Sequence, residues 1–195
     1  MIPIKNAKEA EKMRQACRVA SDILDRVVAI IRPGITTKEV DEAAAEMMKE
    51  AGVKSAFLGY RIGHRVYPGN ICISLNDEVI HGIASQRRIQ YGDIVKLDIG
   101  VIRDGWIGDT ATTVPVGVID EQTERLLRVT ERALERAIAW LIRVGGWATS
   151  ARRSRTKQRV TNLMSYASLS VMGLDEDCMR NLRSRITESA AAGRC

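Results

Sequence analysis

No run of apolar residues in this chain of 195 residues approaches the roughly 20 that a membrane-spanning helix requires. Residues 1–5 lack the apolar core of a secretory signal peptide, so we expect a cytoplasmic location. Cysteine is scarce, and no two cysteines have the Cys-x-x-Cys spacing of a metal site. We therefore expect free thiols in a reducing compartment. The cysteines are Cys17, Cys72, Cys178 and Cys195.

Neither sign of charge is in excess over residues 1–139, which contain 20 basic and 20 acidic side chains. The net charge of +6 therefore lies in residues 140–195, where ten basic residues stand against four acidic ones. A basic arm is typical of nucleic-acid binding. Hydrophobic residues make up 45% of the chain, which is enough to form a core.

The N-terminal region has the period of helices. Residues 7–31 place apolar side chains on one helical face, and Arg32-Pro33-Gly34 ends the pattern. Thr36 and Glu39 form a capping box, which predicts a second helix to about residue 52.

The pattern then changes to short extended segments. We predict extended chain at 53–60, a loop at 61–66, a turn at 67–70 and strands at 71–75 and 78–82. A last amphipathic helix begins near residue 120. The fold class is therefore α+β: two helices, an antiparallel sheet with hairpins and one further helix, followed by an irregular C-terminal tail.

Two aspartates, Asp98 and Asp109, lie on either side of a strong turn signal. Asp104-Gly105 favours a type I′ turn, because both central residues of such a turn need positive φ. The resulting register makes Asp98 and Asp109 diagonal neighbours on one face of a hairpin, with β-carbons roughly 7 Å apart. Two carboxylates at that distance suit a pair of divalent metals with a bridging carboxylate.

Two simpler interpretations stand beside the metal site. Aspartates in hairpins are often solvated and bind nothing. Alternatively Lys96, which the same register places on the same face, pairs with one of the two carboxylates.

Short motifs from residue 3 to about 139 resemble, in order, the type I methionine aminopeptidases, which have the pita-bread metallopeptidase fold. The matching segments are residues 58–60, 67–72, 74, 76–79, 81–83, 92–100 and 104–111. Residues 61–66 look like an insertion relative to that family. The resemblance implies removal of the N-terminal methionine from nascent polypeptides, by a monomer that acts close to the ribosome.

The resemblance also implies roles for single residues. Asp98 matches an aspartate that binds one metal, and Asp109 matches the aspartate that bridges two. His81 matches the catalytic histidine that contacts the substrate near the scissile bond. The remaining matches are walls of the pocket for the methionine side chain; they are Tyr60, Tyr67 and Cys72. The implied cofactors are two divalent ions of cobalt, manganese, iron or zinc, since such a site accepts all four.

Two other functions remain open at this point. One is a non-catalytic binding module that uses the basic tail on RNA or the ribosome. The other is a relative that cleaves Xaa-Pro bonds, which the match of Tyr60, Tyr67 and Cys72 to a methionine pocket argues against. We expect no membrane partner and no specific nucleic acid.

The resemblance stops near residue 139. The family has a second half that supplies one histidine and two glutamates as metal ligands, and a further catalytic histidine. Residues 140–195 contain no histidine, and their only glutamates are Glu176 and Glu188. We therefore divide the chain into a homologous half, residues 1–139, and a non-homologous tail, residues 140–195.

A shifted reading frame explains the tail. If the last base of each codon is joined to the first two bases of the next, residues 166–187 permit Arg-Glu-Phe-Val-Gly-His-Gly-Ile-Gly-Arg-Gly-Leu-His-Glu-Glu-Pro-Gln-Ile-Pro-Asn-Tyr. This stretch resembles the missing family segment with its two histidines. We expect a frameshift near residues 139–144 and a truncated, poorly folded and inactive product. Its unpartnered sheet would expose an edge and an apolar surface.

Overall fold

The computed structural model describes residues 5–143. The chain divides after Ile119 into two compact units, the first of which contains the sheet. Within the described residues, no helix combines the length and the apolar composition needed to cross a lipid bilayer. Most of the predicted tail, residues 144–195, lies outside the described residues.

Two capped helices open the first unit, as predicted. Helix α1 spans Ala7–Ile30 and begins with a capping box between Asn6 and Glu9. Helix α2 spans Thr37–Glu50, and its capping box joins Thr36 and Glu39. Each box satisfies backbone N–H groups that a helix start leaves without partners, which fixes both starting points.

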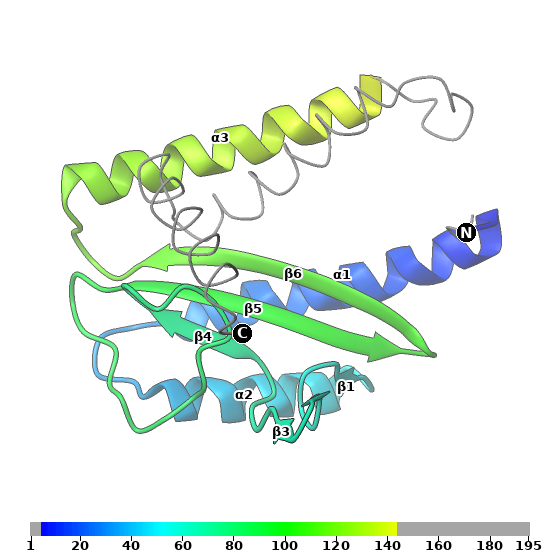
Figure 1. The fold of residues 1–195 in the computed structure, drawn as a ribbon, viewed down its shortest axis with the longest axis horizontal. Helices are drawn as coiled ribbons and strands as arrows, with labels where there is room; N and C mark the ends of the chain where they lie inside the picture. The colour runs from blue at the N-terminus through cyan, green and yellow to red at the C-terminus, as the bar shows by residue number, and fades with distance from the viewer. Residues whose placement is uncertain (1–4, 144–195) are drawn as a thin grey trace, which may run out of the picture. The chain divides into compact units, whose positions relative to one another are not determined.

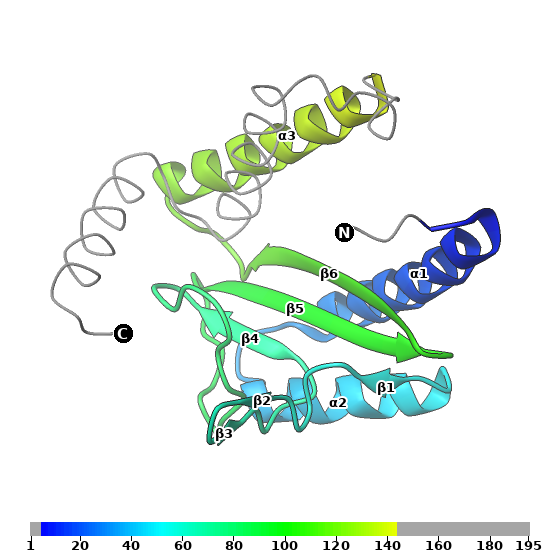
Figure 2. The ribbon, with the colours of Figure 1, turned by 45° about the vertical axis from the view of Figure 1, so that its right-hand side comes forward.

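An antiparallel sheet is built around one long strand, β5 (Ile94–Arg103). Strand β6 (Trp106–Pro115) pairs along one side of β5. On the other side β5 pairs with β4 (Cys72–Leu75) and, farther along, with the short β1 (Lys54–Ser55). Figures 1 and 2 show β5 between β4 and β6.

The β5–β6 hairpin has the predicted register. Asp98 lies opposite Ala111, and Asp109 lies opposite Gly100. The turn residues Asp104 and Gly105 have φ values of +50° and +79°, as a type I′ turn requires.

The core lies between the sheet and helices α1 and α2. Alternate residues of β5 point into it, so Val95, Leu97, Ile99 and Val101 are fully buried. Helix α1 packs closely on β6, because a β-carbon on Gly108 would lie 2.3 Å from the carbonyl oxygen of Ala16. The opposite face of the sheet is left for polar side chains.

Two local predictions were wrong. Residues 61–66 form a small hairpin rather than a loop, with β2 (Arg61–Ile62) paired to β3 (Arg65–Val66). Residues 78–82 form no strand. The Glu78 backbone N–H instead donates to the Leu75 carbonyl, which closes a turn, and His81 adopts a left-handed φ of +57° that a strand cannot contain.

The second unit contains helix α3 (Glu121–Arg143). Asp120 caps it by accepting a hydrogen bond from the Thr123 backbone N–H at 2.9 Å. The start of this helix agrees with the prediction.

Candidate metal centre and surrounding pocket

The two hairpin carboxylates are electrostatically coupled. Burial is the main cause that raises the pKa of Asp98 to about 6, and repulsion by Asp109 and a hydrogen bond with it add to the effect. A cation placed between the two carboxylates would relieve this repulsion. The diagonal geometry predicted from the turn is thus confirmed.

Cys72 occupies the position next to Asp98 across the sheet. The β4–β5 register places the two residues opposite each other, so their side chains share one face. Cys72 is buried and its thiol is free. Burial raises the pKa of this thiol to about 11, with the nearby carboxylate of Asp98 contributing. The thiol is therefore a neutral, apolar wall beside the carboxylates.

The hydroxyl of Tyr67 lies beside the thiol of Cys72, with which it shares a hydrogen bond. This hydroxyl donates to the Gly82 carbonyl at 2.8 Å and lies 3.2 Å from the Ile71 carbonyl. Burial and a hydrogen bond with Cys72 raise the pKa of Tyr67 far above its ordinary value. The hydroxyl thus stays protonated and acts as a fixed donor.

A buried carboxylate on α2 anchors the turn between Tyr67 and Cys72. Asp41 accepts hydrogen bonds from the Asn70 backbone N–H at 2.7 Å, the Asn70 side-chain amide at 2.9 Å and the Ile71 backbone N–H at 3.0 Å. The Asn70 carbonyl in turn accepts from the Ser55 hydroxyl at 2.6 Å. Bonds to an ionised group are the strong ones, so this turn is rigidly placed.

Tyr60 joins this region through its backbone only. Its carbonyl accepts from the Tyr67 N–H at 2.8 Å, but its side chain is 60% exposed. Of the three residues predicted to line the methionine pocket, Tyr67 and Cys72 therefore lie together, whereas Tyr60 is exposed.

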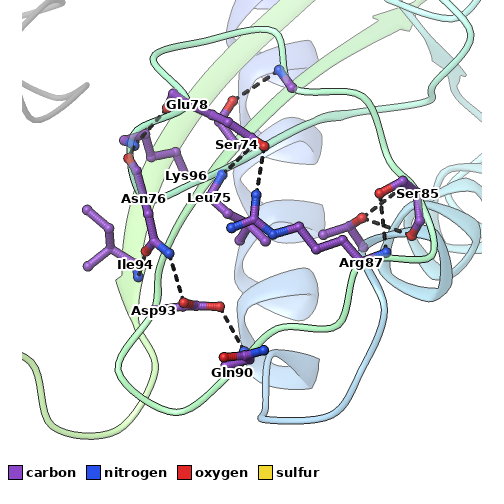
Figure 3. Close-up of polar contacts among 12 residues, drawn as sticks. Ser74, Leu75, Asn76, Glu78, Ser85, Arg87, Gln90, Asp93, Ile94 and Lys96 are labelled. Carbon is purple, nitrogen blue, oxygen red and sulfur yellow. Dashed lines mark hydrogen bonds and ion pairs between the residues drawn. The ribbon is translucent and has the colours of Figure 1, made fainter.

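The proposed pairing of Lys96 with an aspartate of the hairpin is wrong. The Lys96 ammonium donates instead to the backbone carbonyls of Asn76 and Glu78, the latter at 2.8 Å (Figure 3). Burial lowers the pKa of Lys96. Asp98 and Asp109 consequently remain available to a cation.

The donor set fits a divalent cation but is small. Carboxylate oxygens are suitable ligands for manganese, iron, cobalt and zinc. Across residues 5–143, however, no third histidine, cysteine, aspartate or glutamate lies near enough to complete a group of three. Asp98 and Asp109 would hold a metal only together with ligands from elsewhere.

Sequence reasoning gave no role to two residues that shape this region, Asp41 and Ser74, although Ser74 was among the residues that match the family. Both carried a signal. Asp41 stands on the buried stripe of α2, next to Val40 and three residues before Ala44, where an acid needs a partner. Ser74 lies two residues after Cys72 on β4, so it shares the face of the carboxylates.

Comparison with known proteins agrees with this arrangement. The model of metallopeptidase family M24 matches residues 11–168. Methionine aminopeptidase 1B, chloroplastic, of Arabidopsis thaliana is 41% identical over 128 residues, which are 66% of this chain and 34% of that protein. Methionine aminopeptidase 1 of Bacillus subtilis is 40% identical over 138 residues, or 71% of this chain and 54% of that protein.

The crystal structure of methionine aminopeptidase from Rickettsia prowazekii superposes with a TM-score of 0.67 at 34% identity. The match covers 71% of this chain and 54% of that one, so the chain spans about half the length of its bacterial relatives. The described architecture is thus part of the pita-bread fold, as predicted. Since the family match covers most of the chain, this protein belongs to metallopeptidase family M24.

Proposed function

We propose that this chain derives from a methionine aminopeptidase, which removes the N-terminal methionine from nascent polypeptides. The observation that carries the proposal is the coupled pair Asp98 and Asp109, flanked on the same face by the buried Cys72. The similarity to methionine aminopeptidases at about 40% identity supports the substrate class. The enzyme would act as a cytoplasmic monomer, close to the ribosome.

Asp98 and Asp109 would hold divalent cobalt, manganese, iron or zinc. When bound, such metals lower the pKa of water and polarise a peptide carbonyl. Cys72, Tyr67 and Tyr60 would line the pocket for the methionine side chain, whose thioether packs well against soft and aromatic groups. His81 would contact the substrate beside the scissile bond.

We further propose that residues 140–195 are read out of frame, so that the chain of 195 residues is inactive by itself. It contains two histidines, His64 and His81, neither of which lies in the second-half region. The regrouped codons of residues 166–187 would encode two further histidines. The frame hypothesis also accounts for the arginine-rich tail without a nucleic-acid ligand.

The frame is tested by sequencing the DNA through codons 135–200. An inserted or deleted base relative to a clean read is the expected result. Codons that cannot be regrouped into the family-like stretch would overturn the frame hypothesis.

The function is tested by comparing this chain with a version whose frame is restored. With Mn²⁺ or Co²⁺ present, we expect only the restored version to release methionine from a Met-Ala-Ser peptide. Asp98→Asn and Asp109→Asn in the restored version should abolish the release. Asp104→Asn, which changes an exposed acid in the turn of the same hairpin, is the matched control and should retain it. Equal activity of the original chain would refute the proposed inactivity.

A further inference from the structure

His81 has an unusual backbone. Three described non-glycine residues have positive φ: Asn76, His81 and Asp104. Asn76 and Asp104 lie in turns, where such values are common, but His81 does not. A residue in this region costs free energy and persists only where its surroundings hold it in place.

Gly82, the next residue, is held from three directions. Its N–H donates to the Ser74 hydroxyl at 3.0 Å. Its carbonyl accepts from the Ile73 N–H at 3.0 Å and from the Tyr67 hydroxyl at 2.8 Å. Gly82 lies so close to β4 that a β-carbon would stand 2.2 Å from the Ile73 carbonyl oxygen. Both backbone polar groups of Gly82 are therefore satisfied by fixed partners.

Those partners are themselves rigid. Ser74 and Ile73 belong to β4 and are 2% and 1% exposed. The Tyr67 side chain is hydrogen-bonded to that of Cys72, and Asp41 anchors the turn that joins those two residues.

The rest of the segment is tied at both ends (Figure 3). Before His81, Lys96 bonds the Asn76 and Glu78 carbonyls. After it, Ser85 exchanges hydrogen bonds with Thr37 at 2.8 and 3.0 Å. Between these ties, Gly82 is the point where the backbone beside His81 is fixed to the sheet.

We propose that Tyr67 and Ser74 are positioning residues, which set the orientation of His81 through their hydrogen bonds to Gly82. The role of His81 as a substrate contact rests on the proposed function, but its positioning does not. Ser74 and Cys72 share the strand face that carries Asp98, and the Tyr67 hydroxyl reaches from Cys72 to Gly82. The backbone beside His81 is thereby fixed to β4, which pairs with the strand that carries Asp98, and this needs no part of the second half of the family fold.

The test uses the complete chain of 195 residues labelled with ¹³C-histidine. Only His64 and His81 give ring signals, and a His81→Gln variant assigns them. We expect Tyr67→Phe and Ser74→Ala to shift and broaden the His81 signal while the His64 signal stays unchanged. In Ser74→Ala, which removes the acceptor of the Gly82 N–H, amide hydrogen exchange at Gly82 should accelerate about tenfold. Ser74→Cys keeps a weak acceptor, so its rate of amide exchange at Gly82 should lie between those of the parent and of Ser74→Ala.

Matched controls remove the same groups elsewhere. Tyr91→Phe deletes a hydroxyl from a tyrosine that is 65% exposed, and Ser21→Ala does so on the exposed side of α1. Neither should alter the His81 signal. An unchanged His81 signal in both test variants and unchanged Gly82 exchange in Ser74→Ala would overturn the proposal. So would Gly82 exchange in the parent chain as fast as in an unfolded peptide. The readouts contain no metal and no turnover, so a failure of metal binding or peptidase activity would count against the proposed function alone.

Discussion

The β5–β6 hairpin and the segment of residues 76–83 both carry residues of the candidate site, but they are held in place by different forces. The hairpin is specified locally, by a two-residue turn and alternating burial. The segment has no regular structure, and distant side chains such as Tyr67, Ser74 and Lys96 hold it. Local patterns can therefore place the two candidate metal-binding acids, whereas the histidine depends on contacts far along the chain.

The largest effect should come from placing the same methyl group in each region. Gly108→Ala would push a β-carbon against the backbone of α1, and Gly82→Ala would push one against the backbone of β4. Because β6 cannot leave the core, we expect Gly108→Ala to lower the free energy of unfolding by about 3 kcal/mol. Gly82 lies outside the strands and can move away from β4 at the loss of its hydrogen bonds, so its variant should cost about 1 kcal/mol. Urea denaturation monitored by circular dichroism measures both.

Equal losses in the two glycine variants would contradict the distinction between the regions. Amide hydrogen exchange adds a second check. In Gly82→Ala, exchange should accelerate only at residues 79–84, while the amides of β5 stay protected.

A smaller effect is expected at the anchor of the turn before β4. Asp41→Ala leaves the Asn70 and Ile71 N–H groups without their acceptor and should cost about 2 kcal/mol. Asp41→Asn keeps one acceptor oxygen and should cost about half as much. Asp22→Ala, on the exposed surface of α1, is the control and should change stability little. A neutral Asp41→Ala variant would show that the turn is held by its own local preferences.

Substitutions in the turn of the hairpin should lower the free energy of unfolding less. Gly105 has a φ of +79° and open space around it, so Gly105→Ala costs backbone strain of about 1 kcal/mol without a clash. Gly105→Asn should cost less, because asparagine tolerates this region. Thermal unfolding of the two variants gives the ranking, and an alanine variant as stable as the parent would be inconsistent with a type I′ turn.

The smallest effect should be the pH dependence contributed by Asp98. Its pKa is raised to about 6, above the ordinary 3.8, so the folded state binds the proton more tightly than the unfolded state. The stabilisation is fully present below pH 4 and is lost as the pH rises to about 6. Relative to Asp98→Asn, the parent should therefore lose about 1 kcal/mol over this range, after allowance for solvent screening.

Urea titrations at several pH values, without divalent metal, provide this measurement. The free energy of unfolding of Asp104→Asn should depend on pH in the same way as that of the parent. A difference between the parent and Asp98→Asn that does not change with pH would mean that Asp98 is solvated rather than coupled to Asp109.

Several features could be predicted from the sequence because their causes are local. The capping box at Thr36 and the turn at Asp104-Gly105 each depend on residues within a few positions. The register of the hairpin follows from its turn, and the juxtaposition of Asp98 and Asp109 follows from the register. The free state of Cys72 followed from the absence of cysteine spacing.

Residues 78–82 show why other features could not be predicted from the sequence. Their composition suits a strand, but Lys96 and the Glu78 side chain bind the preceding turn, and Gly82 is fixed to β4 by a serine and a tyrosine. Propensity was overruled there by hydrogen bonds, and those made by Ser74, Tyr67 and Lys96 span 8 to 20 residues.

Local chemistry in the chain thus determined where helices begin, where the hairpin turns and which acids share its face, because those choices are made over a few residues. The tertiary structure decided the backbone conformation of His81, the burial of Cys72 beside Tyr67 and the hydrogen-bond partners of the Lys96 ammonium. Each of these depends on groups that only folding brings within hydrogen-bonding distance, and no pattern over neighbouring residues encodes such a meeting.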